Sequence, residues 1–239
     1  MSDFAAANGP IHTRREPTAN DMETAVFGAT GRTGRHVVRE ALAADHEVRA
    51  FVRDREKLAD DRREDDRVTV VEGDVIDAEA VERAIEGADA IVSALGHADG
   101  SPDNVLTIAA ENITAAMEAH DVPRVVTLVG AGVSHPNDSP SLGGRVMSGA
   151  LKLVAGDLLD DSNEHVRRVI GSDIEWVVVR PPRLTDGPGT GDYRTGYLRL
   201  GPRATISRAD LAAFMIAQAS TDTDADADTY IGEAPMIAY

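Results

Sequence analysis

The chain has 239 residues, and its 41 acidic and 24 basic residues give a formal net charge of −17 at pH 7. It contains no cysteine, which excludes disulfides, thiol catalysis and cysteine-ligated metal sites. We expect no nucleic-acid partner, because this charge repels a phosphate backbone. We also expect no membrane partner, because no apolar stretch approaches the roughly 20 residues that span a bilayer. The length suits a single α/β domain with a small lobe.

The acidic residues are spread over the whole chain, whereas Lys57 and Lys152 are the only lysines. Abundant aspartate with scarce lysine is typical of a protein that works in high salt, where screening weakens self-repulsion. An acidic partner-binding surface is the alternative interpretation. Residues 1–21 lack the charged start and apolar centre of a signal peptide. We therefore expect a flexible leader at 1–21, a single domain over 22–239 and a cytoplasmic location.

The first predicted strand covers residues 23–28 and leads into the glycine-rich segment GATGRTG at 28–34, with a helix over 32–44. In a dinucleotide site the first glycine permits the tight turn, the second lets the backbone approach a pyrophosphate, and the third lets helix and strand pack closely. A plain strand–turn–helix is the alternative. The predicted phosphate-binding residues are Gly28, Thr30, Gly31, Arg32, Thr33 and Gly34.

A second strand is predicted over 47–52, followed by Arg53. Folds that bind NAD place an acidic residue about 20 positions after the glycines, on the ribose 2′-hydroxyl. Arg53 stands 19 positions after Gly34, and a cation there suits a 2′-phosphate. Lys57 adds a second positive group, whereas Asp54 either serves NAD or starts a turn. The pattern favours NADP(H) over NAD(H).

Strands and helices alternate along the rest of the chain, which predicts an α/β fold with a doubly wound parallel sheet. The substrate side is expected at about 180–239. Strands are predicted at 68–72, 90–94, 124–129 and 174–179, and a short one at 229–232. Helices are predicted at 78–87, 104–120, from about 144 to 170, and 208–220, with loops at 130–144 and 180–203.

Ligands of such sheets bind at the carboxyl ends of the strands, so the loops there are candidate site segments. Asp74 and Val75 follow the third strand and are predicted to contact the adenine. Leu95 and Gly96 follow the fourth and are predicted to let the cofactor approach the main chain. Ordinary turn chemistry is the alternative for all four residues. Polar candidates for contact with substrate or nicotinamide are His97, Ser134 and His135.

Several segments together resemble an atypical short-chain dehydrogenase/reductase. They are GATGRTG, FVRD at 51–54, EGDV at 72–75, SALG at 93–96, ENITAAM at 111–117 and VRPPRLT at 179–185. The resemblance covers about 24–231 and is greatest to the NADPH-dependent flavin reductase/biliverdin-IXβ reductase family, alongside NmrA-like proteins. It implies a Rossmann fold, bound NADP(H), and hydride transfer to a planar acceptor such as a flavin.

Two positions depart from the pattern of the mammalian flavin reductases. Val129 and Gly130 stand where that family has Thr-Ser near the nicotinamide, and Arg183 stands where it has a histidine. The identity of the acceptor is therefore left open by the resemblance.

The Tyr-x-x-x-Lys pair of classical short-chain dehydrogenases is absent. The residues four positions before Lys57 and Lys152 are Arg53 and Ser148, and a serine is a poor acid near neutral pH. The catalytic residues stay unassigned, with Ser134, His135 and Lys152 as candidates. No metal-ligand spacing is present. Flavin and quinone reduction needs no such pair, because the protein mainly binds and orients two rings.

Three further residues invite assignment. His165 is expected on a solvated helix face, Trp176 in the core, and Arg180 either beside an anionic group or in a structural role. The leading function is an NADPH-dependent reductase of a flavin, quinone or similar planar acceptor. The alternative is an NmrA-like protein that senses NADP(H) without catalysis. Sugar-nucleotide epimerisation or dehydration is disfavoured, since it needs a positioned base and a larger lobe. The oligomeric state is not predicted.

Overall fold

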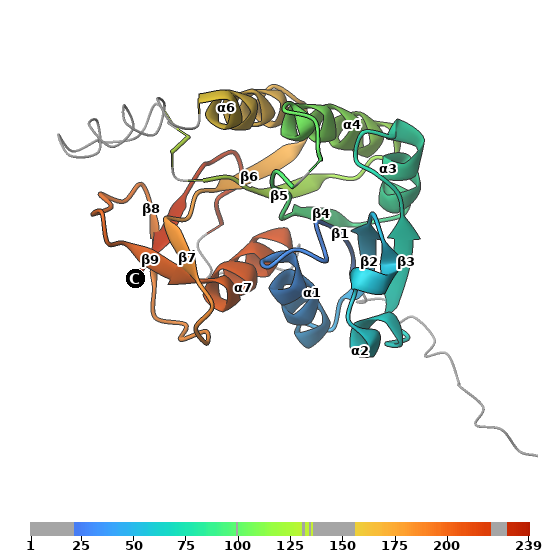
Figure 1. Cartoon of the computed structure of the whole chain (residues 1–239), viewed down its shortest axis with the longest axis horizontal. Coiled ribbons are helices and arrows are strands. Elements are labelled where there is room, and N and C mark those ends of the chain that lie inside the picture. The colour runs from blue at the N-terminus through green and yellow to red at the C-terminus, as the bar shows by residue number, and fades with distance from the viewer. Residues whose placement is uncertain (1–21, 99, 131, 134, 136–155, 221–228) are drawn as a thin grey trace, which may run out of the picture.

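The computed structural model describes residues 22–98, 100–130, 132–133, 135, 156–220 and 229–239. Within these residues, six parallel strands form one sheet in the order β3-β2-β1-β4-β5-β6 (Figure 1). The strands are β1 Glu23–Phe27, β2 Glu47–Val52, β3 Val68–Glu72, β4 Ala90–Ser93, β5 Arg124–Leu128 and β6 Glu175–Val179. The predicted doubly wound parallel sheet is confirmed, and its strand order reverses between β1 and β4.

Helices cover both faces of the sheet (Figure 1). On one face lie α1 Gly34–Ala43 and α7 Arg208–Ala219; on the other lie α3 Ala78–Ile85, α4 Val105–Ala119 and α6 Gly156–Ile170. A short 3₁₀ turn, η1 Arg55–Lys57, and α2 Asp60–Arg63 connect β2 to β3.

The central strands carry mostly apolar side chains because they are buried on both faces. Along β1, Ala25 and Phe27 face the cluster under α3, α4 and α6, whereas Val26 faces the cluster under α1 and α7. All three side chains are fully buried. The two hydrophobic layers therefore fix which helices cover each face of the sheet.

Three boundaries differ from the sequence prediction. Helix α1 begins at Gly34 rather than 32, because residues 28–33 form a turn in which the Gly31 amide donates to the Gly28 carbonyl at 2.9 Å. The strand expected at 229–232 is wrong, since Gly232 turns with φ +74° and the strand β10 is Met236–Ala238. The segment 180–203, expected to be irregular, contains the short strands β7 Arg183–Thr185 and β8 Arg194–Gly196.

These short strands build the C-terminal lobe. Strand β10 pairs antiparallel with β8, and β7 pairs parallel with β9 Thr205–Ser207. The Asp210 carboxylate ties the lobe to α7: it accepts hydrogen bonds from the Thr190 and Gly191 amides at 2.9 Å and from the Tyr239 hydroxyl at 2.6 Å. The lobe is thus fixed to the start of α7.

Arg180 and Trp176, two residues noted in the sequence, both make contacts inside the fold. Arg180 is fully buried, and its guanidinium donates to the carbonyls of Ala234 at 2.9 Å and Val133 at 3.0 Å. Trp176 is half-buried and packs against the cluster under α3, α4 and α6. The structural interpretation of Arg180 and the packing role of Trp176 fit these contacts.

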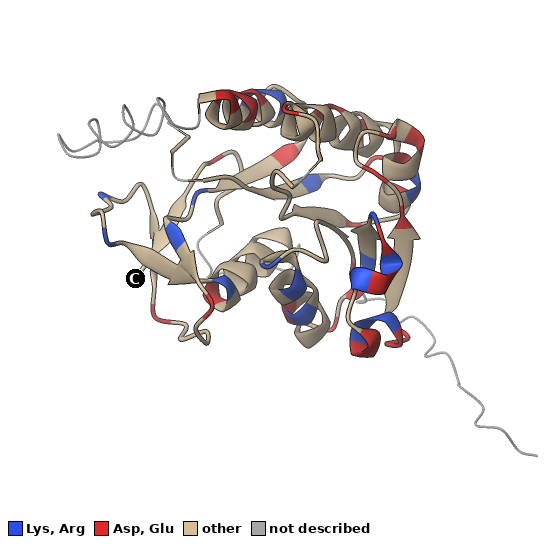
Figure 2. Ribbon diagram, viewed as in Figure 1, with Lys and Arg blue, Asp and Glu red and all other residues tan. Residues whose placement is uncertain are grey.

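Acidic and basic side chains are mixed on the outer helices, as Figure 2 shows for α1, α2 and α6. Arg168 on α6, for example, pairs with Glu164 at 2.9 Å and with Glu111 on α4 at 3.2 Å. Exposed pairs of this kind contribute little to stability, so burial of the two hydrophobic layers dominates. In the described part of the chain no helix is both long and apolar enough to cross a bilayer.

The Gly34→Ala variant tests the packing of α1 on the turn. A Cβ at position 34 clashes with the Gly28 carbonyl group, which is backbone and cannot move aside as a flexible side chain can. We expect the free energy of unfolding, measured by urea denaturation, to fall by about 3 kcal/mol. The control is Gly201→Ala, where a Cβ meets nothing within 4 Å. Equal stability of the two variants contradicts this account of the turn.

Candidate functional site

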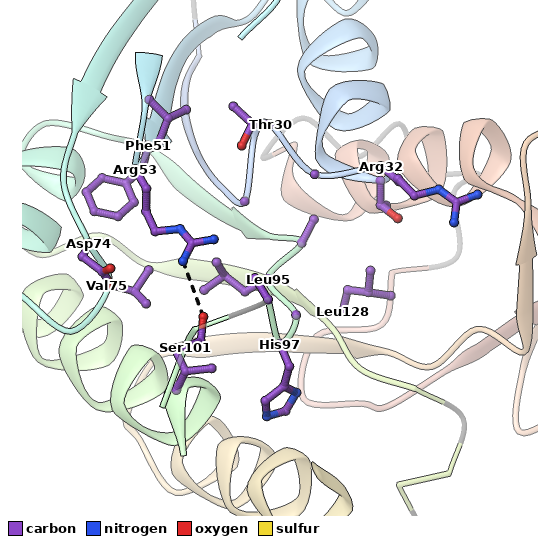
Figure 3. A pocket seen from close by; sticks show the side chains of 18 of the residues that line it. Thr30, Arg32, Phe51, Arg53, Asp74, Val75, Leu95, His97, Ser101 and Leu128 are labelled. Atoms are coloured by element: carbon purple, nitrogen blue, oxygen red, sulfur yellow. Dashed lines mark hydrogen bonds between the residues drawn. The ribbon is translucent and has the colours of Figure 1, made fainter. Parts of the chain in front are cut away.

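A cavity of about 380 Å³ opens at the carboxyl edge of the sheet, where the strand order reverses between β1 and β4 (Figure 3). Its lining comes from the end of β2, the loops after β1, β2, β3 and β4, the last residue of β5, and the first residues of α4 and α7. The lining residues are Gly28, Thr30, Gly31, Arg32, Thr33, Phe51, Val52, Arg53, Asp74, Val75, Ala94, Leu95, Gly96, His97, Ala98, Ser101, Val105, Leu128 and Arg208.

The glycine-rich turn forms one wall of this cavity. Gly28 has φ +77°, and a Cβ there approaches the Ala94 carbonyl oxygen of the β4 loop to 2.8 Å. The turn therefore needs glycine both for its conformation and for its closeness to β4. Helix α1 follows with no side-chain cap and no acidic residue in its first turn. Its N-terminus thus offers backbone N–H groups to an anion, which fits a dinucleotide pyrophosphate.

Arg53 defines the end of the cavity that follows β2. Its Nη1 donates to the Ser101 hydroxyl at 3.5 Å, and in Figure 3 the guanidinium extends over the cavity toward Ser101. Asp54 instead accepts the Glu56 amide at 3.0 Å and starts the 3₁₀ turn. The Lys57 ammonium lies 3.7 Å from the Asp54 carboxylate, away from the cavity lining. Of the charged residues just after β2, only Arg53 lines the cavity.

His97 and Asp161 form a hydrogen-bonded pair beside the cavity. Nε2 of His97 lies 2.8 Å from Oδ2 of Asp161, whose side chain is 2% exposed. The Asp161 carboxylate also accepts the amides of Leu106 at 3.0 Å and Thr107 at 2.9 Å, so it caps the N-terminal turn of α4. Among the described residues Nδ1 of His97 has no hydrogen-bond partner. The carboxylate fixes one ring nitrogen and leaves the other to a ligand.

His165 is buried, not solvated as its sequence position suggested. Its Nε2 lies 2.9 Å from the Thr127 hydroxyl and its Nδ1 lies 3.0 Å from the Leu106 carbonyl. Burial lowers the pKa of His165, because a charged ring loses solvation inside the protein. The residue joins α6, β5 and α4, and it holds the helices that position Asp161 rather than lining the cavity.

The structure brings most of the predicted cofactor residues to one cavity. The two exceptions are Lys57 and Gly34, which lies behind the turn in contact with the Gly28 backbone. The ring of His135 packs 5.4 Å from that of Tyr197, outside the cavity lining. Ser134, Ser148 and Lys152 lie outside the described residues. Within the described segments no cluster of three or more His, Asp or Glu side chains offers a metal site.

Three polar contributors to the site were missed from the sequence: Ser101, Asp161 and Arg208. Asp161 leaves no local signal, since it acts on a helix 55 residues earlier. Arg208 has a local sequence signal, because Ser207 and Asp210 form the S-x-x-D pattern that marks a helix start. Ser207 does cap α7, accepting the Asp210 amide at 2.9 Å. That pattern places Arg208 at the first position of α7, next to the sheet edge.

Comparison with known proteins agrees with this arrangement. The sequence matches the NAD(P)H-binding family over residues 28–222. The chain belongs to this family. Among curated proteins it is 27% identical over 180 residues to the uncharacterized protein YwnB of Bacillus subtilis, an alignment that spans 73% of this chain and 79% of YwnB.

Solved structures share the fold across almost the whole chain. A short-chain dehydrogenase/reductase from Veillonella parvula, in complex with NADP, aligns with a TM-score of 0.75 and 15% identity over 91% of this chain and 94% of its own. The anaerobilin reductase ChuY from Escherichia coli O157:H7 aligns with a TM-score of 0.71 and 21% identity over 90% and 96%. Both similarities concern the fold.

The buried His165 predicts how stability changes with pH. Its pKa is lowered in the folded state, so just below the ordinary value of 6.5 the unfolded chain binds a proton that the folded chain does not. The free energy of unfolding is therefore expected to fall as the pH drops below about 6.5, by at most about 1.4 kcal/mol per pH unit for this group. Burial also lowers the pKa of His36 and His46, which act in the same direction.

The measurement is urea unfolding from about pH 7.5 to about pH 5.5 at one salt concentration, for the native chain and the His165→Gln variant. The variant loses two hydrogen bonds and is less stable throughout, so the slopes are compared rather than the absolute values. We expect a shallower slope in the variant. Parallel curves contradict a neutral buried His165.

Proposed function

We propose that this protein is an NADPH-dependent reductase that transfers a hydride to a flavin, a quinone or a similar planar acceptor. The observation that carries the proposal is the cavity itself, with a glycine turn at a helix N-terminus on one wall and Arg53 at the end of β2. A cation at that position suits the 2′-phosphate that distinguishes NADP(H) from NAD(H). The Ser101 hydroxyl, 3.5 Å from Nη1 of Arg53, is a second donor for that phosphate.

Further support comes from the relatives. One structural neighbour was solved in complex with NADP, and another is named an anaerobilin reductase. The sequence also resembles the flavin reductase/biliverdin-IXβ reductase group, whose acceptors are extended planar molecules. The acceptor of this protein is proposed by class only, because Val129, Gly130 and Arg183 depart from that group's pattern.

Different residues along the cavity are assigned to nucleotide binding and to proton supply. NADPH supplies the hydride, so no metal or acyl nucleophile is needed. Arg53 and the glycine turn hold the nucleotide, and Leu95 and Gly96 bring main chain against it. We assign proton supply to His97, since reduction of a quinone to a hydroquinone takes one hydride and one proton. The proton passes from His97 to the acceptor oxygen and is replaced from water.

A sensor that binds NADP(H) without turnover is the second candidate, and the absent Tyr-x-x-x-Lys pair favours it. The two candidates separate in one assay. NADPH binding is followed by fluorescence in concentrated KCl, and absorbance at 340 nm is then recorded with FMN, menadione and biliverdin. Decay at 340 nm supports the reductase. Tight binding with no decay for all three acceptors supports the sensor.

Arg53→Gln tests the cofactor preference. The variant loses a charge-assisted contact with the 2′-phosphate, so we expect its Kd for NADPH to rise about tenfold to a hundredfold. Its Kd for NADH should change less than about twofold, because NADH lacks that phosphate. The matched control is Arg55→Gln, an exposed arginine on the next turn. Equal losses for NADPH and NADH contradict the role of Arg53.

His97→Gln tests the proton source. Glutamine retains a donor toward Asp161 but cannot take up and release a proton. We expect kcat with menadione to fall about a hundredfold, in the range of general acid catalysis, while the Kd for NADPH stays the same. The half-buried His120, paired with Glu82 at 3.0 Å and outside the cavity lining, provides the control variant His120→Gln. An unchanged kcat in His97→Gln assigns the proton to water instead.

A further inference from the structure

Arg208 is a buried cation at the cavity whose hydrogen bonding is incomplete. It is the first residue of α7, lines the cavity and is 8% exposed. Its Nη1 donates to Oδ1 of Asp186 at 2.6 Å, but its Nε is buried without any hydrogen-bond partner among the described residues. An unsatisfied donor on a buried charge is costly, which points to a ligand that completes the contacts.

Asp186 connects this arginine to the glycine turn. Its Oδ2 accepts from Nη2 of Arg32 at 2.6 Å, so one carboxylate bridges Arg32 and Arg208. Arg32 and Asp186 are largely exposed, and the hydrogen bond from Arg32 is the main cause that lowers the pKa of Asp186. Two guanidiniums against one carboxylate leave one positive charge. Among the described residues, Asp186 is the hydrogen-bond partner of the Arg208 side chain.

Charges of both signs surround the bridge. Burial is the main cause that lowers the pKa of His36 on the first turn of α1; Arg39 and Arg208 lower it further, whereas Glu40 and Asp186 raise it. The N-terminus of α1 has neither a side-chain cap nor an acidic residue in its first turn. The N-terminal turn of α1 therefore meets two arginines at the wall where the glycine turn lines the cavity. An anion of more than one charge suits this environment better than the single carboxylate of Asp186.

We infer that Arg208 is a ligand of the cofactor pyrophosphate, and that Asp186 is an internal anion which holds Arg32 and Arg208 until the phosphate oxygens replace it. This inference rests on the proposed binding of a dinucleotide. It adds a phosphate ligand from the start of α7 to the donors that the glycine turn supplies. The exchange of partners by Arg208 also couples the loop that carries Asp186 to cofactor binding.

Arg208→Met tests the inference by titration of the full chain with NADP⁺ and NAD⁺, measured by calorimetry in concentrated KCl. Both nucleotides contain the pyrophosphate, so we expect both Kd values to rise by about tenfold and by the same factor. Arg53→Gln, in contrast, weakens NADP⁺ alone. Arg208→Lys keeps the charge without the planar fork and is expected to lie between the native chain and Arg208→Met. The exposed Arg203→Met is the matched control.

Asp186→Asn separates a direct role of Arg208 from a structural one. If Asp186 competes with phosphate, removal of its charge leaves the Kd for NADP⁺ unchanged or lowers it. If Arg208 acts only by holding Asp186, the two variants weaken binding alike, and the inference is wrong. Thermal unfolding of each variant shows whether the fold is intact. A fully folded Arg208→Met with native Kd values also overturns the inference, whereas a native chain that binds neither nucleotide overturns the proposed function itself.

Discussion

Two close backbone contacts of the β1–α1 turn constrain the rest of this structure. Gly28 approaches the carbonyl of Ala94 at the end of β4, and Gly34 lies against the carbonyl of Gly28. No side chain fits at either contact, so the turn packs directly against the β4 loop and α1 packs directly against the turn. This places the uncapped N-terminus of α1 at the sheet edge where the strand order reverses. The cavity and its affinity for an anion follow from that placement.

The core of the fold was predictable because its signals are local. Each of the six strands is a short run rich in apolar residues between turn residues, and the inner strands are buried on both faces, so they show little polar alternation. The errors fall where pairing is distant in sequence. Strand β10 exists because Met236 pairs with Gly196, 40 residues earlier, and nothing within 229–239 marks that register. The parallel pairing of β7 with β9 is hidden in the same way, since each strand has three residues.

The residues of the candidate site differ in the same way: some have a local sequence signal and others do not. The glycine turn and the residues after β2, β3 and β4 were found because parallel strands bring their carboxyl ends to one edge. Asp161 contacts groups at least 54 residues away in the sequence, and Asp186 contacts groups at least 22 residues away. No motif connects either aspartate to these groups. His165 was misplaced because its helix has charged residues on either side, while its own face packs against β5 and α4. Tertiary packing decided these positions, not local pattern.

The distribution of charge explains how so acidic a chain can hold an anionic cofactor. The chain carries 17 negative charges in excess, yet Arg32, Arg53 and Arg208 all reach one cavity. Among the residues that the structure describes, Asp74 is the only acidic one in its lining. Exposed acids farther than a Debye length are screened, and in concentrated salt that length shrinks to a few ångströms. Arg208 is buried, so its contacts are screened much less than those of the surface. High salt therefore removes the repulsion of the surface while it preserves the attraction of the site, and arginine, whose planar fork binds phosphate oxygens in pairs, suits that role better than lysine.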